Sequence, residues 1–177
     1  MNPDRWHPWT RFLPSPVING FATLGPIGYW GKAPGTNGTV AGVLLYTVLF
    51  FFLSPLAYLV MTALLIYLAI AFCGEAEKRL FKRDPGEVIL DEVAAIPICF
   101  FGLQMAIADF GIWAWLILLA GFGLFRLFDI LKPFGIKRLQ SMPGGLGVVV
   151  DDLAAGVATC ICLHLLVYLI RPYLVSV

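Results

Sequence analysis

Long apolar runs separated by short polar segments dominate the sequence. Several runs approach the roughly 20 residues that an α-helix needs to cross a hydrocarbon core. Ser54 and Pro55 interrupt one long apolar stretch, which would be roughly 50 Å long as a single helix and therefore fits two helices better. The pattern predicts an all-α protein with about five transmembrane helices, over residues 40–53, 55–72, 93–108, 112–131 and 148–170.

The composition supports a polytopic integral membrane protein. Of 177 residues, 60% are hydrophobic and 13% are charged, and a soluble domain could not cover so much apolar surface with so few charges. We expect one membrane-embedded domain over residues 1–177, with residues 1–24 as an N-terminal segment that is either interfacial or flexible. Four prolines lie within the first 20 residues, before any long apolar run, so we expect no cleaved signal segment.

The basic residues predict the orientation in the membrane. With five crossings, eleven of the twelve Lys and Arg residues fall on one side, and Arg171 alone falls on the other. Because Lys and Arg accumulate in cytoplasmic loops, the basic side and the N-terminus are expected to be cytoplasmic. The net charge of +1 says little about partners. We expect the membrane and a phospholipid as partners and no nucleic acid, and the sequence leaves any oligomeric partner unknown.

The same five crossings bring most of the conspicuous charged residues to the cytoplasmic side. The predicted group consists of five carboxylates (Asp91, Glu92, Asp129, Asp151 and Asp152) and two cations (Arg126 and Lys132). Such a group needs protonation, ion pairing or a bound divalent cation, and oxygen ligands without His or Cys favour Mg²⁺. The alternative is that acids such as Asp91 and Asp151 cap helix N-termini.

Two glycine-rich stretches flank the expected helices on this side. The stretch GYWGKAPGTNGT, residues 28–39, precedes the first helix and contains Lys32 and Thr36. Its backbone N–H groups could bind an anion, and by itself the stretch could equally be a tight entry of the chain into the membrane. Gly144, Gly145 and Gly147 lead into the aspartate pair, where they would allow the backbone to approach a ligand. Together with the acids and cations, these stretches favour phosphoryl chemistry at the level of a lipid phosphate.

Four sequence blocks, GKAPGTNGT, DPGEVILDE, FRLFDILKP and GGLGVVVDDLAAG, resemble the signature blocks of the phosphatidylglycerophosphatase A family, in order and over about residues 25–165. The resemblance implies a Mg²⁺-dependent phosphatase of the bacterial inner membrane that converts phosphatidylglycerophosphate to phosphatidylglycerol in the inner leaflet. Ala95 and Gly135 depart from residues that are common in the family, which affects local packing more than chemistry.

Carried over by position, the family motifs fall on the seven charged residues above, on Pro34, Gly35 and Thr36, and on the upstream acid Asp84. Our hypothesis is that the five carboxylates share Mg²⁺ binding and general-base catalysis. Arg126, Lys132 and Lys32 would hold the phosphate, and the loop around Thr36 would supply backbone donors. The sequence does not separate base from metal ligand, or attack by water from an aspartyl-phosphate intermediate.

Two other classes of function compete with a phosphatase. A cation-coupled transporter would also use carboxylates within a membrane, but it favours acids near the bilayer midplane and internal symmetry, whereas these acids gather at one surface without a detectable repeat. A structural subunit would need neither the acidic group nor the glycine-rich stretches. Uptake by vesicles would identify a transporter, and acid-to-amide variants would identify a structural subunit.

Overall fold

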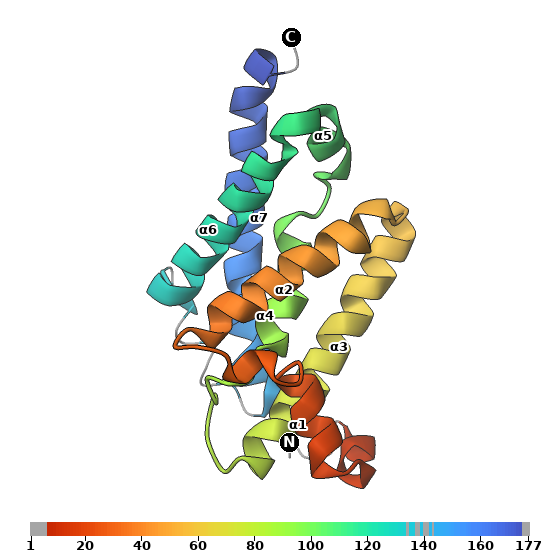
Figure 1. Cartoon of the computed structure of the whole chain (residues 1–177), viewed down its shortest axis with the longest axis vertical. Helices are drawn as coiled ribbons and strands as arrows, with labels where there is room; N and C mark the ends of the chain where they lie inside the picture. The colour runs from red at the N-terminus through yellow and green to blue at the C-terminus, as the bar shows by residue number, and fades with distance from the viewer. Residues whose placement is uncertain (1–6, 134, 137–138, 140–141, 143, 175–177) are drawn as a thin grey trace.

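The computed structural model describes residues 7–133, 135–136, 139, 142 and 144–174, and within these residues the fold contains helices and no strand (Figure 1). The all-α prediction is thereby confirmed. In chain order the elements are η2 (Pro8–Phe12), α1 (Ser15–Ala22), η3 (Ile27–Tyr29), α2 (Pro34–Val48), η4 (Phe50–Phe52), α3 (Pro55–Arg79), α4 (Leu90–Cys99), α5 (Gln104–Asp109), η5 (Gly111–Trp113), α6 (Ala114–Leu131) and α7 (Gly145–Leu174).

Four helical segments of the described chain are long and apolar enough to cross a membrane: Pro34–Phe52, Pro55–Arg79, Gly111–Leu131 and Gly145–Arg171. The protein is therefore a multi-pass membrane protein. The expectation of a fifth long helix over residues 93–108 is wrong, because this segment divides into α4 and α5. Pro97 lies inside α4 and cannot donate a backbone hydrogen bond, and Gly102 then turns the chain with a φ of +77°.

The divided segment still connects the two ends of the helix bundle. At its start, Asp91 lies beside Asp152 of α7, and at its end Asp109 forms an ion pair of 2.8 Å with Arg171 near the other end of α7. We call the end that contains Asp91 the carboxylate end. Because nine of the ten residues of α4 are buried, its apolar character reflects packing against protein rather than contact with lipid.

Helix α4 lies at the centre of the bundle and packs against α2, α3 and α7 (Figure 1). Small residues allow close approach: a Cβ at Gly42 of α2 would lie 2.6 Å from Ile96 Cγ1, and one at Gly156 of α7 would lie 3.0 Å from the Ala95 carbonyl oxygen. Such small-residue contacts are the usual basis of helix packing in membranes. The position of α4 is thus determined by three neighbouring helices.

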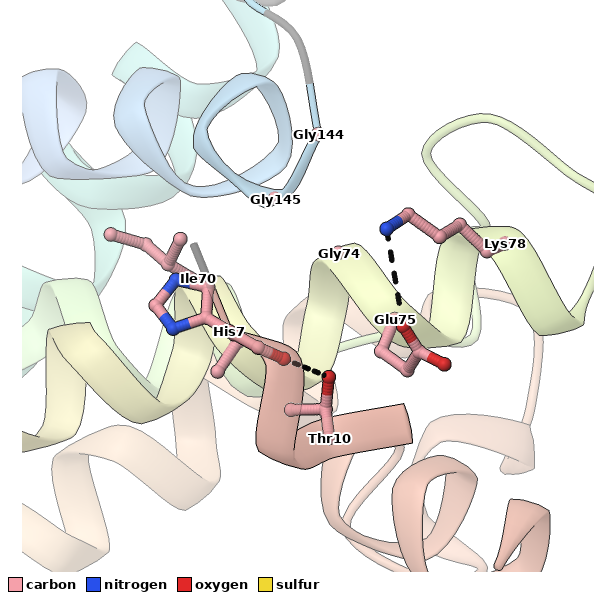
Figure 2. Close-up of a pocket in the computed structure, with 9 residues that line it drawn as sticks. His7, Thr10, Ile70, Gly74, Glu75, Lys78, Gly144 and Gly145 are labelled. Atoms are coloured by element: carbon pink, nitrogen blue, oxygen red, sulfur yellow. Dashed lines mark hydrogen bonds and ion pairs between the residues drawn. The ribbon is translucent and has the colours of Figure 1, made fainter. Parts of the chain in front are cut away.

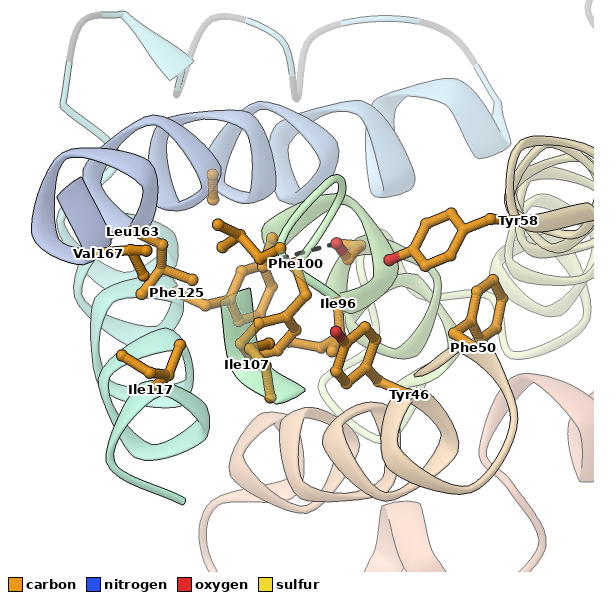
Figure 3. Packing of buried hydrophobic residues seen from close by; sticks show 14 of the residues in the cluster. Tyr46, Phe50, Tyr58, Ile96, Phe100, Ile107, Ile117, Phe125, Leu163 and Val167 are labelled. Carbon is orange, nitrogen blue, oxygen red and sulfur yellow. Dashed lines mark hydrogen bonds between the residues drawn. The ribbon is translucent and has the colours of Figure 1, made fainter. Parts of the chain in front are cut away.

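Large buried side chains fill the core beyond α4, and they come from most of the long helices (Figure 3). Tyr46 of α2 stacks on Phe100 with ring centroids 4.5 Å apart. The Tyr58 hydroxyl of α3 donates to the carbonyl oxygen of Pro97. This hydrogen bond attaches α3 to α4 at the place where proline weakens the helix.

The N-terminal segment folds onto the carboxylate-end half of α3. Arg79 donates from Nη1 to the Leu13 carbonyl oxygen at 2.8 Å and from Nη2 to the Thr10 carbonyl oxygen at 3.0 Å. Trp9 donates from its indole nitrogen to the Tyr67 hydroxyl at 2.9 Å. Figure 2 shows the small pocket that this segment forms with α3 and the first residues of α7.

Replacement of Arg79 by glutamine is expected to release the N-terminal segment from α3. Hydrogen bonds from a charged donor contribute about 1.5–3 kcal/mol each, so amide hydrogen exchange within η2 and α1 should accelerate roughly 10-fold or more. Lys82→Gln is the matched control, because it removes an exposed ion pair of 3.0 Å with Glu87, a residue outside the N-terminal segment. Equal exchange rates in both variants would contradict this role of Arg79.

Candidate active site

The carboxylate end collects charged side chains from α4, α6 and α7, beside the first turn of α2. We define the carboxylate cluster as Asp91, Glu92, Asp129, Asp151 and Asp152, with Arg126 and Lys132 as its cations. Four of the acids are buried, with exposed fractions of 3% for Asp151, 5% for Asp152, 6% for Asp91 and 9% for Glu92. Burial of so many acids is costly unless cations compensate them, so the group is unusual for a purely structural core.

Asp91 and Glu92 occupy the first turn of α4. The Glu92 N–H donates to Asp91 Oδ1 at 3.1 Å, but Asp91 does not cap α4, because the N-cap is Ile89 and Asp91 is the second residue of the helix. Glu92 Oε1 lies 3.8 Å from Arg126 Nη1, and Glu92 Oε2 is buried without a hydrogen-bond partner among the described residues. A buried carboxylate oxygen without a partner indicates a place for a ligand that carries positive charge.

Helix α7 begins earlier than expected, at Gly145 instead of about residue 148. The reason is a backbone contact with α3: a Cβ on Gly74 would lie 2.6 Å from the Gly145 nitrogen, so both positions need glycine. Asp151 and Asp152 are therefore the seventh and eighth residues of the helix, about two turns from its start. Capping of α7 by Asp151 is excluded, because a capping side chain bonds within the first turn.

The end of α6 supplies both cations. Arg126 Nη1 lies 2.8 Å from Asp129 Oδ2, one turn further along the helix. Lys132 caps the C-terminus in the left-handed region, with a φ of +44°, and this turn directs its ammonium to Asp151 Oδ2. Burial tends to lower the pKa of Lys132, but the hydrogen bond and charge of Asp151 raise it above its usual value, so the ammonium stays protonated.

The first turn of α2 contacts the cluster through backbone. Pro34, Gly35 and Thr36 form this turn and not a loop, because proline is favourable as the first residue of a helix. A Cβ on Gly35 would overlap Glu92 Oε1 and would lie 2.9 Å from Arg126 Nη1. Thr36 is half-buried, and Lys32 lies on the exposed loop before the helix, so the structure does not bring Lys32 into the cluster.

Sequence reasoning missed Gly38, one turn further along α2. A Cβ there would lie 3.0 Å from Glu92 Oε2 and 2.9 Å from Ile89 Cβ, so only glycine leaves the α2–α4 contact undisturbed. The spacing of Gly35, Gly38 and Gly42 along one helix face could have indicated this contact.

Asp84 lies in the connection between α3 and α4, with a φ of +48°. Its N–H donates to Glu77 Oε1 at 3.0 Å, which holds the turn. Burial and the negative charge of Asp151 raise the pKa of Asp84 above its usual value, whereas Lys132 opposes the rise. The turn therefore holds this sixth acid near the Lys132–Asp151 ion pair, at the edge of the cluster.

Three of the acids form a candidate metal centre. Asp91, Glu92 and Asp152 each offer an oxygen, and these atoms all lie within 4.8 Å of one another. All of the donors are oxygen, and the cluster has five acids against two cations, so it fits a hard divalent cation such as Mg²⁺ or Mn²⁺. The separate observation that favours such an ion is the buried Glu92 Oε2, which has no hydrogen-bond partner within the described part of the chain.

A multi-pass helical membrane protein with buried carboxylates, guanidinium and ammonium groups at one end has the features of a membrane-embedded phosphatase. The comparison with family models supports this class: residues 20–167 match the family described as phosphatidylglycerophosphatase A. The chain belongs to the phosphatidylglycerophosphatase A family, as the four sequence blocks predicted, and it is a lipid phosphatase.

Two curated relatives are similar over most of their length. A putative phosphatidylinositol-3-phosphatase of Bacteroides thetaiotaomicron is 33% identical over 149 residues, which cover 82% of this chain and 88% of the relative. A phosphatidylglycerophosphatase A of Haemophilus influenzae is 33% identical over 137 residues, which cover 77% of this chain and 80% of the relative. The search of solved structures found no match.

Proposed function

We propose that the protein is a Mg²⁺-dependent phosphatase that hydrolyses the terminal phosphate of phosphatidylglycerophosphate and leaves phosphatidylglycerol. The convergence of Asp91, Glu92 and Asp152 within 4.8 Å, beside Arg126, is the observation that carries the proposal. The choice of substrate is supported by the family and by the name of the Haemophilus relative. The Bacteroides relative is named as a putative phosphatidylinositol-3-phosphatase, so phosphatidylinositol 3-phosphate is included in the test as a second substrate.

The reaction replaces the ester oxygen on phosphorus with an oxygen from water, and the leaving alcohol takes up a proton. Mg²⁺ held by Asp91, Glu92 and Asp152 would supply Lewis-acid chemistry that neutralises the phosphate oxygens. Arg126 and Lys132 hold the negative charge that develops in the transition state, and their ion pairs with Asp129 and Asp151 fix their positions. A carboxylate of the cluster accepts the proton of the attacking water.

The first turn of α2 completes the phosphate site in this proposal. Pro34 has no N–H, and the Thr36 and Asn37 N–H groups donate to the Ala33 carbonyl oxygen at 3.0 and 3.4 Å. The Gly35 N–H is therefore the backbone donor proposed for the phosphate, at the positive end of the helix, where anions are favoured. Gly35 allows that backbone to approach Glu92 and Arg126 directly. Lys32 attracts the substrate from the exposed loop, and Asp84 lies where it orients the Lys132 ammonium through its charge.

The proposed location is the inner membrane of a bacterium, with the N-terminus and the carboxylate end in the cytoplasm. Among the described Lys and Arg residues, Arg171 lies at the opposite end and the others lie toward the carboxylate end, as the positive-inside rule expects. The substrate phosphate is then presented from the inner leaflet, at the level of the cluster.

The test is phosphate release by purified protein in detergent, with phosphatidylglycerophosphate and phosphatidylinositol 3-phosphate as parallel substrates. We expect release from phosphatidylglycerophosphate that requires Mg²⁺, falls at least about 100-fold with a chelator and returns when Mg²⁺ is restored. Faster release from the inositol lipid would contradict the substrate. If folded protein releases phosphate from neither lipid, the proposed hydrolysis is contradicted. Uptake of cations by vesicles that contain the protein would then support a transporter.

A further inference from the structure

The Lys132 ammonium lies against two of the acids. It forms an ion pair with Asp151 Oδ2 and lies 3.9 Å from Asp129 Oδ1. The left-handed backbone at this residue is uncommon for a side chain with a Cβ, and the Lys132 N–H donates to the Phe128 carbonyl oxygen at 2.8 Å. The backbone of Lys132 thus adopts a strained conformation that places one positive charge between two carboxylates.

The ion pairs divide the carboxylate cluster into two sets. Asp91, Glu92 and Asp152 bring three oxygens within 4.8 Å of one another. Among the described residues no ion pair occupies Asp91 or Asp152, and Glu92 Oε1 makes a long pair of 3.8 Å with Arg126 Nη1. Asp129 instead uses Oδ2 for Arg126 and directs Oδ1 to Lys132, while Asp151 uses Oδ2 for Lys132. The second set is therefore already compensated by side chains of the protein.

Carboxylate-rich sites that transfer phosphoryl groups often hold two metal ions, about 3.5–4 Å apart. Here a second ion would have to bind Asp129 and Asp151, where the buried Asp151 Oδ1 has no hydrogen-bond partner among the residues that the structure describes. One protein oxygen is a poor site for Mg²⁺, which requires an octahedral shell. We propose that the Lys132 ammonium takes the place of a second divalent cation, so that the cluster binds one metal ion.

This inference rests on the proposed function, because it presupposes one metal ion at Asp91, Glu92 and Asp152. It assigns Lys132 a distinct role as a fixed charge that the protein supplies itself. Its removal frees Asp129 Oδ1 and Asp151 Oδ2, which together with Asp151 Oδ1 offer three oxygens for an additional ion. A variant that lacks the Lys132 ammonium should therefore bind an additional metal ion at the place that the ammonium occupies in the wild type.

The experiment measures Mn²⁺ binding to the full chain in detergent, by equilibrium dialysis and by electron paramagnetic resonance. Wild type should bind about one Mn²⁺ per chain, and Lys132→Met should bind about two, with spectral coupling between ions roughly 4 Å apart. Lys132→Arg is the matched control, because it keeps the positive charge and should stay near one ion per chain.

The possible outcomes distinguish a failure of the proposed role of Lys132 from a failure of the proposed phosphatase function. Two ions in wild type, or one ion in a folded Lys132→Met variant, overturn the role of Lys132 and leave the phosphatase proposal intact. No Mn²⁺ in wild type contradicts the metal centre itself, and the inference fails with it. If Lys132→Met does not fold, the wild-type stoichiometry and the Lys132→Arg control still decide between one ion and two.

Discussion

Asp152→Asn is expected to lower the rate of phosphate release roughly 10³-fold while the fold stays intact. Asp152 is 5% exposed, and its carboxylate lies within 4.8 Å of ligand oxygens from Asp91 and Glu92. The amide has nearly the same shape but no charge, so it weakens the metal centre without opening a cavity. Relief of repulsion among three buried acids should keep the melting temperature equal or raise it.

A large loss of activity together with an equal or raised melting temperature distinguishes a functional acid from a structural one. The measurements are kcat/KM for phosphate release and the melting temperature of the same protein preparation. Asp109→Asn is the matched control, because Asp109 pairs with Arg171 at the opposite end of α7 in an exposed ion pair worth at most about 1 kcal/mol. An Asp152→Asn variant that keeps more than about a tenth of the wild-type rate would remove Asp152 from the proposed metal centre.

Gly145→Ala is expected to have the largest effect on stability. A Cβ at this position would overlap the Ile70 carbonyl oxygen and would lie 2.9 Å from the Gly74 nitrogen, so α3 and α7 would have to separate. Overpacking of this kind lowers the free energy of unfolding by about 1–3 kcal/mol. The opposing atoms of α3 belong to the backbone, which moves aside less easily than a flexible side chain. Because Asp151 and Asp152 follow two turns later, their distances to α4 should change and activity should fall as well.

Gly123→Ala is the control for this substitution. Gly123 lies in α6, and a Cβ there would have nothing within 4 Å, so the change should be neutral or stabilise the helix by up to about 1 kcal/mol. Thermal unfolding in detergent and phosphate release are measured for both variants. Equal melting temperatures for Gly145→Ala and Gly123→Ala would show that the α3–α7 crossing tolerates a side chain.

Much of the architecture could be predicted because it depends on local properties of the sequence. Length and apolarity identify helices that cross a membrane, and the charge distribution places the seven charged residues of the site at one end. The exception was the segment over residues 93–108. Its apolar run approaches the length of a membrane helix, but Pro97 and Gly102 divide it and α4 is buried in protein.

The sequence by itself determined the helical class, the family and which charged residues gather at the carboxylate end, because hydropathy, charge and motif spacing are one-dimensional properties. Only the tertiary structure decided how these residues are paired. The start of α7 at Gly145 depends on a contact with Gly74, and the role of Gly38 depends on the crossing of α2 and α4. The convergence of Asp91, Glu92 and Asp152 and the ion pair between Lys132 and Asp151 likewise depend on distances between helices, which spacing along the chain does not encode.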